Sequence, residues 1–118
     1  MATAPASPTV VALLAVPEVT AATLYGFYDA LSSAGRDWQV LHGREPGAAL
    51  FRPIVVSADG APVLGANGVR IHVDASFVDC PPPDVVCITD VAVMPGQPLD
   101  RCYEPAVAWL SERHRAGS

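Results

Sequence analysis

Polar side chains able to bind a ligand follow two apolar segments of the chain. Glu18 comes just after an apolar run at residues 9–16. Thr89 and Asp90 follow a second apolar run at residues 85–88. If both runs are parallel strands of one sheet, their carboxyl ends meet at the edge where open α/β sheets bind ligands. We therefore treat Glu18, Thr89 and Asp90 as candidate ligand contacts.

Each of these residues also has a simpler, structural interpretation. Glu18 precedes a predicted helix, whose positive N-terminal end favours a carboxylate without any ligand. Thr20 lies where that helix begins, and threonine is a common cap residue there. Thr89 and Asp90 are also typical of the start of a solvated loop. The structural interpretation is the simpler one for all of them, and the ligand-binding interpretation stays open.

The spacing of cysteines and histidines indicates neither a zinc site nor a redox pair. These residues are Cys80, Cys87, Cys102, His42, His72 and His114. The thiols are expected to be inert, because no acidic or histidine neighbour in the sequence would activate one. The glycine-containing segments match no phosphate-binding motif. We expect no metal and no cofactor.

Composition limits the classes of function. The chain has 118 residues, of which 51% are hydrophobic, and this suits one domain with a sheet covered on both faces or a surface meant for a partner. Its net charge is −5, and its seven basic residues are scattered arginines, so we expect no direct nucleic-acid contact. The longest apolar run is far shorter than the roughly 20 residues that cross a membrane. Without a basic residue before that run there is no export signal, so we expect a cytoplasmic protein.

The apolar pattern predicts strands and helices in alternation. Residues 9–16 read as a central strand buried on both faces. Residues 20–34 read as a helix whose apolar stripe contains Leu24, Phe27, Tyr28 and Leu31, with Gly35 after its end and Gly26 packed against a neighbouring backbone. Residues 38–41 read as a second strand. Residues 85–88 read as a buried parallel strand, followed by a helix that begins near Pro105, faces inward through Val107, Trp109 and Leu110, and ends at Gly117.

Turn signals divide the middle of the chain. Asp59-Gly60 separates the β-type runs 54–56 and 62–64, and Asp-Gly between such runs predicts a hairpin. Asn67-Gly68 marks a second turn before residues 69–73. We expect this region to form an antiparallel excursion beside the main sheet.

This order of elements predicts an α/β fold. The expected architecture is a three-layer αβα arrangement of the flavodoxin or Rossmann type, with a mainly parallel sheet. Residues 1–8 are interpreted as a flexible lead-in, and residues 9–118 as the N-terminal part of the domain. The final helix is not followed by a strand, so the sheet is expected to keep an unpaired edge at residues 85–88 and to need a complementary partner or an oligomer.

Four segments carry a resemblance to a known family: residues 11–17, Leu24-Tyr25-Gly26, Asp84-Val85-Val86 and the tail at residues 107–117. Together they resemble the DJ-1/PfpI superfamily, which has the class I glutamine amidotransferase-like fold. The closer resemblance is to the N-terminal sensor domain of AraC-type transcription regulators. In that family the last helix leads to a strand and a sharp turn that presents a nucleophilic cysteine, and the present sequence ends before that turn.

Two departures from the family bear on catalysis. The resemblance places Thr23 where catalytic members carry an acid, and a threonine cannot serve as a general base near pH 7. The chain reads Ile88-Thr89-Asp90 where many members have a pair of glycines. With the cysteine turn also absent, Thr23 becomes a fourth candidate ligand contact and no catalytic residue is predicted.

The resemblance implies a non-catalytic ligand-sensing and dimerisation part of a transcriptional regulator, with a helix-turn-helix segment outside this chain contacting DNA. The alternative is the front half of a hydratase, amidase or glyoxalase-like enzyme, whose catalytic cysteine lies on a missing segment or a second chain. A third interpretation is an interaction module that self-associates through the unpaired sheet edge. The expected partners are a small-molecule ligand and either a second copy or a complementary half-chain.

Overall fold

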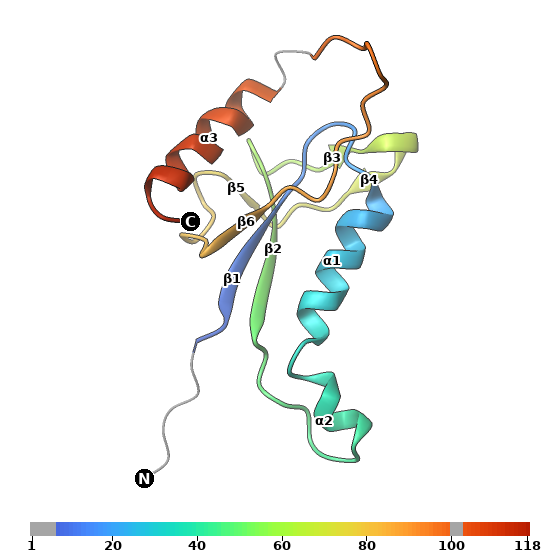
Figure 1. Cartoon of the computed structure of the whole chain (residues 1–118), viewed down its shortest axis with the longest axis vertical. Coiled ribbons are helices and arrows are strands. Elements are labelled where there is room, and N and C mark those ends of the chain that lie inside the picture. The colour runs from blue at the N-terminus through green and yellow to red at the C-terminus, as the bar shows by residue number, and fades with distance from the viewer. Residues whose placement is uncertain (1–6, 100–102) are drawn as a thin grey trace.

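A parallel sheet with helices on both faces organises the chain (Figure 1). The computed structural model describes residues 7–99 and 103–118. Most of the predicted lead-in and Cys102 lie outside these residues. The elements are β1 (Thr9–Leu14), α1 (Ala21–Ser33), α2 (Asp37–Leu41), β2 (Phe51–Ser57), β3 (Val63–Leu64), a 3-10 turn (Ala66–Gly68), β4 (Arg70–Ile71), β5 (Ala75–Ser76), β6 (Val85–Cys87) and α3 (Glu104–Arg115).

The main sheet has four strands in the order β5-β2-β1-β6, and each neighbouring pair is parallel. Ala12 of β1 lies between Ile54 of β2 and Val86 of β6. The apolar run at residues 9–16 is therefore central, as its composition predicts, because only a strand covered on both faces can be apolar throughout. β6 is an edge strand of this sheet and none of its residues is buried, so the prediction of a buried strand at residues 85–88 is wrong in its burial, although the parallel pairing is as predicted.

Successive residues of β1 and β2 point to opposite faces, and each face buries one helix. Ala12, Leu14, Ile54 and Val56 pack with Ala106 and Trp109 of α3. Ala15 and Val55 pack with Leu24 of α1 on the other face. Figure 1 shows α1 and α3 on opposite sides of the strands. The fold is the expected three-layer αβα arrangement.

Residues 38–41 are not a strand, and the prediction there is wrong. They form the short helix α2, which buries none of its residues. Asp37 in its first turn suits the helix dipole. The ring of His42 lies 4.3 Å from the ring of Trp38, four residues earlier. These local contacts favour a helical turn where no neighbouring strand is available to pair.

The predicted hairpin at Asp59-Gly60 is also wrong. Residues 54–56 belong to β2, which pairs in parallel with β1. The side chain of Asp59 instead accepts a hydrogen bond from the N–H of Ala61 (3.0 Å), which makes a local turn. The antiparallel excursion is confined to β3 and β4, which pair around the 3-10 turn at Asn67-Gly68 with Val63 opposite Ile71.

In each of the two long helices, one residue that was predicted to face the core is exposed. α1 follows Thr20 and ends before Gly35, as predicted, but Phe27 is exposed because it lies on the flank of the Leu24–Tyr28 face. In α3, Ala106 and Trp109 are buried, whereas Val107 is exposed. Within the described residues, no helix is long and apolar enough to cross a membrane.

Gly26 does not pack closely against another backbone, contrary to the expectation. A Cβ atom at Gly26 would meet no described atom within 4 Å, apart from the backbone of its own helix. Glycine costs a helix interior about 1 kcal/mol relative to alanine. We therefore expect Gly26→Ala to raise the free energy of unfolding by about 1 kcal/mol in urea denaturation followed by circular dichroism. An unchanged or lower urea midpoint would contradict this account of Gly26.

Candidate functional site

The carboxyl ends of β1, β2 and β6 form one edge of the sheet, and the candidate site lies there. Glu18 and Thr20 follow β1, and Thr89 and Asp90 follow β6. Because α3 runs opposite to the strands, its first residues reach the same edge (Figure 1). Three of the predicted residues, Glu18, Thr89 and Asp90, therefore come from segments that meet here, as parallel pairing requires.

Asp90 binds the residue that precedes α1. One carboxylate oxygen accepts a hydrogen bond from the backbone N–H of Thr20 (3.0 Å), and the other accepts a bond from the Thr20 hydroxyl. Nearby, the N–H of Ala92 donates to the carbonyl of Glu18 (2.9 Å). The Thr20 hydroxyl therefore bonds to Asp90 rather than to the amides of α1. Asp90 joins the segment after β6 to the start of α1.

Glu18 joins the sheet edge to α3. Its carboxylate accepts a hydrogen bond from the hydroxyl of Tyr103, which immediately precedes α3, and that hydroxyl lies 3.4 Å from the carbonyl oxygen of Pro17. Glu18 has a φ angle of 72°, a left-handed conformation that costs a non-glycine residue about 1–2 kcal/mol. Its carboxylate thus bonds to the layer opposite α1, whereas the sequence suggests the α1 dipole.

Tyr103 belongs to the candidate site, and the sequence argument missed it. Its signal is its position next to Glu104 and Pro105, where the predicted last helix begins. A helix that follows a parallel strand returns antiparallel to the sheet, so its N-terminal end comes to the carboxyl edge.

The two remaining candidates make no hydrogen bond through their side chains within the described part of the chain. Thr23 is half-buried in the first turn of α1. The hydroxyl oxygen of Thr89 is shielded from water and has no partner among the described atoms. A buried hydroxyl without a partner costs about 1–3 kcal/mol. A hydrogen-bonding molecule at Thr89 would recover part of that cost.

A cavity of about 220 Å³ opens at this edge between β1 and β2. Its polar side chains are Ser57, which is buried at the end of β2, and Asp59. The Ser57 hydroxyl donates to the carbonyl of Ala61 (3.0 Å). The lining residues are Ala15, Val16, Pro17, Ser57, Ala58, Asp59, Val63, Phe77 and Ala106. The sequence argument missed Ser57 and Asp59 because it placed this segment in a hairpin away from the sheet.

The two described thiols, Cys80 and Cys87, lie outside this cavity. Burial raises the pKa of both thiols. For Cys80, Arg113 and Arg52 oppose that effect without cancelling it. The Cys80 thiol donates to the carbonyl of Pro81 (3.1 Å). Within the described residues, no group of three or more histidine, cysteine, aspartate or glutamate side chains is placed to hold a metal ion.

These raised thiol pKa values predict slow alkylation. Only the thiolate reacts with an alkylating reagent. In a Cys102→Ser variant, the alkylation rate of the folded protein should therefore keep rising with pH above about 8.5, the pH at which the alkylation rate of a free thiol begins to level off. The same protein unfolded in urea is the control, and its alkylation rate should reach its maximum at a lower pH. Because the unfolded thiols lose their protons first, the free energy of unfolding should fall as pH rises through this range. Equal labelling rates in the two states would contradict the prediction.

The sheet order and the position of the site define an open three-layer α/β fold with polar residues at the carboxyl ends of its strands.

No protein-family model and no curated protein matches the chain. Several solved structures are similar to it. A provisionally assigned transcriptional regulator from Vibrio parahaemolyticus superposes with a TM-score of 0.67 at 20% identity, over 95% of this chain and 54% of that one. A ThiJ/PfpI family protein from Bacillus anthracis gives 0.60 at 18% identity, over 95% and 49%.

A DJ-1 superfamily protein from Agrobacterium tumefaciens gives a TM-score of 0.52 at 15% identity, over 88% of this chain and 49% of that one. The fold of the chain is therefore the DJ-1/PfpI fold, as the sequence motifs predict. The chain spans about half the length of each of these three proteins.

Proposed function

We propose that the chain is the non-catalytic, ligand-sensing and dimerisation part of a DJ-1/PfpI-like transcriptional regulator in the cytoplasm. The observation that carries this proposal is the state of the two carboxylates at the sheet edge. Glu18 is bonded to Tyr103, and Asp90 is bonded to Thr20. Both carboxylates hold layers of the fold together, and the cavity beside them has mainly apolar walls. Such an arrangement suits binding better than proton transfer.

The cavity indicates the class of ligand. A water molecule takes up about 30 Å³ in the liquid, so about 220 Å³ suits a molecule of roughly four to eight non-hydrogen atoms. Apolar walls favour an aliphatic body. Asp59 favours an amine or a hydroxyl group at one end, since a carboxylate only accepts hydrogen bonds. Small aliphatic amines and alcohols are therefore the ligands proposed.

The sensing step is proposed to act through α3. Ala106 of α3 lines the cavity, and Tyr103 at the start of the same helix holds Glu18. A ligand against Ala106 would bias the position of α3 and with it the Tyr103–Glu18 contact. The acidic charge of the chain supports leaving DNA contact to a segment outside it.

A second candidate function is the front half of a DJ-1/PfpI enzyme of the hydratase, amidase or glyoxalase-like kind. The observation in its favour is the open edge of β6, beside which lies a groove of about 390 Å³. The groove is lined by Val85, Val86, Ile88, Leu110, Arg113, His114 and Ser118. A complementary half-chain would add a strand there and would have to supply the catalytic cysteine.

Titration of ¹⁵N-labelled protein with propylamine, butylamine and butanol tests the sensing function. We expect amide shifts at residues 15, 16 and 57–59, together with shifts around Tyr103. Asp59→Asn should weaken amine binding, whereas Asp79→Asn, which removes a charge away from this cavity, should not. Shifts confined to other surfaces would refute the proposed ligand site. Sequence-specific DNA retention by these 118 residues in a gel-shift assay would refute the division of labour.

A further inference from the structure

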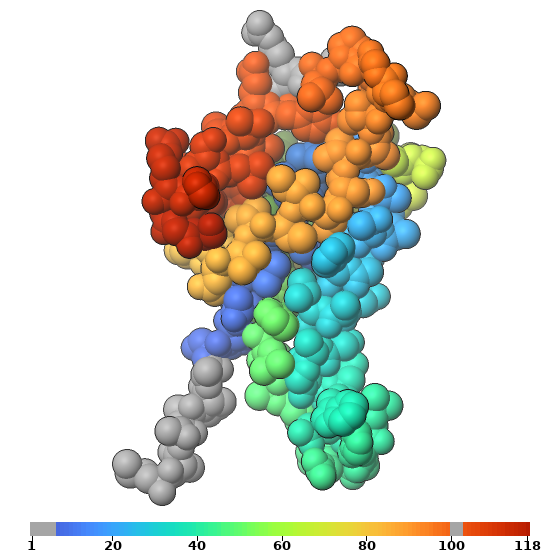
Figure 2. Space-filling model, in the orientation of Figure 1, coloured from blue at the N-terminus to red at the C-terminus, as the bar shows by residue number. Residues whose placement is uncertain are grey.

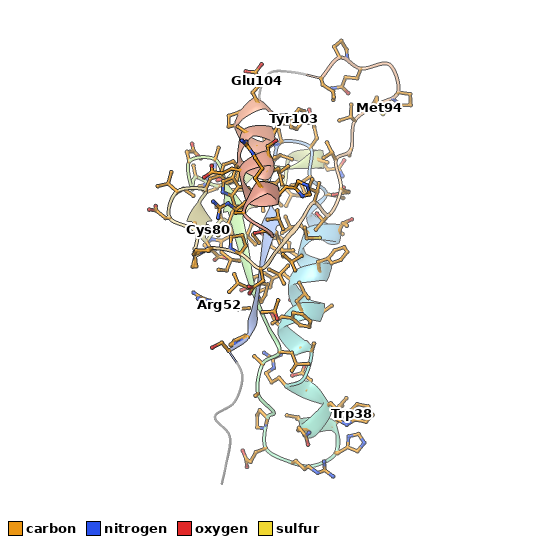
Figure 3. The ribbon with its side chains drawn as sticks, turned by 60° about the vertical axis from the view of Figure 1, so that its left-hand side comes forward. Trp38, Arg52, Cys80, Met94, Tyr103 and Glu104 are labelled. Atoms are coloured by element: carbon orange, nitrogen blue, oxygen red, sulfur yellow. The ribbon has the colours of Figure 1, made fainter. Side chains whose placement is uncertain are left out.

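A knob of residues 36–50, which contains α2, projects from the end of the molecule opposite the candidate site (Figures 1 and 2). It carries large apolar side chains on its surface. Trp38 is 63% exposed, Leu41 78% and Leu50 56%. Figure 3 shows Trp38 on the outer side of the knob, beside α2 and directed away from the sheet. Several large exposed apolar side chains on one projecting segment are typical of an interaction surface rather than of an ordinary solvated loop.

The knob is held in place by backbone contacts at its base. The N–H of Gly47 donates to the carbonyl of Arg36 (3.1 Å), and the N–H of Leu50 donates to the carbonyl of Ala34 (3.4 Å). The chain approaches itself so closely that a Cβ atom at Gly47 would lie 2.2 Å from the carbonyl oxygen of Gly35. The apolar side chains are therefore presented in a preformed arrangement, which lowers the entropy cost of binding.

Charge identifies the partner that suits this surface. The chain has a net charge of −5, but the knob contains two arginines and two acidic residues and is neutral. Arg36 is paired with Asp37 (2.6 Å), and Arg44 is bonded to Gln39 (3.0 Å). Two copies of an acidic chain repel each other least where both are neutral. An anionic membrane would require an excess of basic residues, which the knob lacks.

We propose that the knob is the self-association surface of this chain, with two copies packed knob to knob about a two-fold axis. Trp38 and Leu41 of each copy form the apolar centre. In this pairing we place Arg44 of one copy beside Glu45 of the other, because they are the oppositely charged neighbours of the knob outside the Arg36–Asp37 pair, and the two-fold axis makes that contact twice. This inference rests on the dimerisation part of the proposed function and assigns a surface to it.

Sedimentation of the 118-residue chain over a range of concentrations tests the inference. Leu41→Asp should raise the dimer dissociation constant about tenfold or more, as expected for a central apolar contact. Leu64→Asp is the matched control, because Leu64 is 65% exposed on β3 outside the knob, and it should leave the constant unchanged. Circular dichroism verifies that both variants keep the fold.

A charge exchange provides a second test that does not depend on apolar contacts. Arg44→Glu alone should weaken the dimer by making both knobs acidic. The double variant Arg44→Glu/Glu45→Arg should restore it, because the exchange occurs on both sides of the two-fold axis. Failure of the double variant to recover would refute the proposed pairing.

The remaining outcomes separate the inference from the function on which it rests. A strictly monomeric wild-type chain at high concentration would overturn the dimerisation function itself. A dimer that survives Leu41→Asp but dissociates with Ile88→Asp would overturn the knob and assign the interface to the β6 edge. A monomer that binds phosphatidylglycerol vesicles through Trp38 would also overturn it.

Discussion

Leu24→Ala is expected to lower the free energy of unfolding by about 2–5 kcal/mol. Leu24 is fully buried and is the only buried residue of α1. Its neighbours in the core on this face are Ala15, Val19, Val55, Ile71 and Val73. The start of α1 is held by the bonds between Thr20 and Asp90, so the helix cannot easily move inward to fill the space left by the missing atoms.

Urea denaturation followed by circular dichroism measures this loss, and Phe27→Ala is the control. Phe27 lies on the same helix and is 45% exposed, so its truncation removes much less buried surface and should cost under about 1 kcal/mol. Similar losses for the two variants would mean that α1 does not pack against the sheet through Leu24.

Gly65→Ala is expected to destabilise the protein by about 1–3 kcal/mol, the usual cost of overpacking. Gly65 has an ordinary φ of −78°, so backbone strain is not the cause. The new Cβ atom would lie 2.6 Å from the carbonyl oxygen of Val19 and 3.3 Å from the side chain of Ile71. The carbonyl of Val19 also accepts a hydrogen bond from the N–H of Ala66 (2.9 Å). To make room for the new Cβ atom, the backbone at Gly65 and Ala66 must therefore move away from Val19.

Thermal unfolding together with amide shifts tests the Gly65 prediction. The midpoint should fall, and the largest shifts should appear at Val19 and Ala66, whose mutual hydrogen bond is stretched. The same substitution at Gly26 is the matched comparison and should have the opposite sign. If Gly65→Ala leaves the midpoint unchanged, the close contact with Val19 does not exist in solution.

The central strand β1 could be predicted because its composition reflects burial on both faces. A run such as residues 9–16 is apolar at every position only when both faces of a strand are covered, and β1 is covered by α1 and α3. Its parallel pairing with β6 also follows, because a crossover returns a strand parallel to the first.

The middle of the chain could not be predicted, because its signals are local and ambiguous. Trp38 and Val40 favour strands by propensity, but a strand requires a neighbour, and the sequence does not reveal whether one lies beside them. Asp59-Gly60 stabilises a hairpin turn and an isolated turn equally well. The parallel pairing of β2 with β1 joins residues 42 positions apart in sequence, such as Thr9 and Phe51, so the local turn signals carried no information about it.

Topology predicted that the candidate residues meet at one edge of the sheet, but not how their side chains pair. Parallel strands bring Glu18 and Asp90 to one edge of the sheet, as expected. Their partners depend on rotamers and on the spacing of layers, so the bonds to Tyr103 and Thr20 required coordinates. Ser57 was missed for a different reason, since its strand had been interpreted as part of the hairpin.

Both ends of the described chain lie at the amino ends of the strands. The hydroxyl of Ser118 donates to the carbonyl of Pro83 (2.7 Å), and the N–H of Asp84 donates to the carbonyl of Val10 (2.9 Å), close to the start of β1. Immobilisation through either end, for example on a biosensor chip, would therefore leave the cavity at the far edge of the sheet facing the solution. A reporter fused after Ser118 would be attached directly to α3, the helix that lines that cavity.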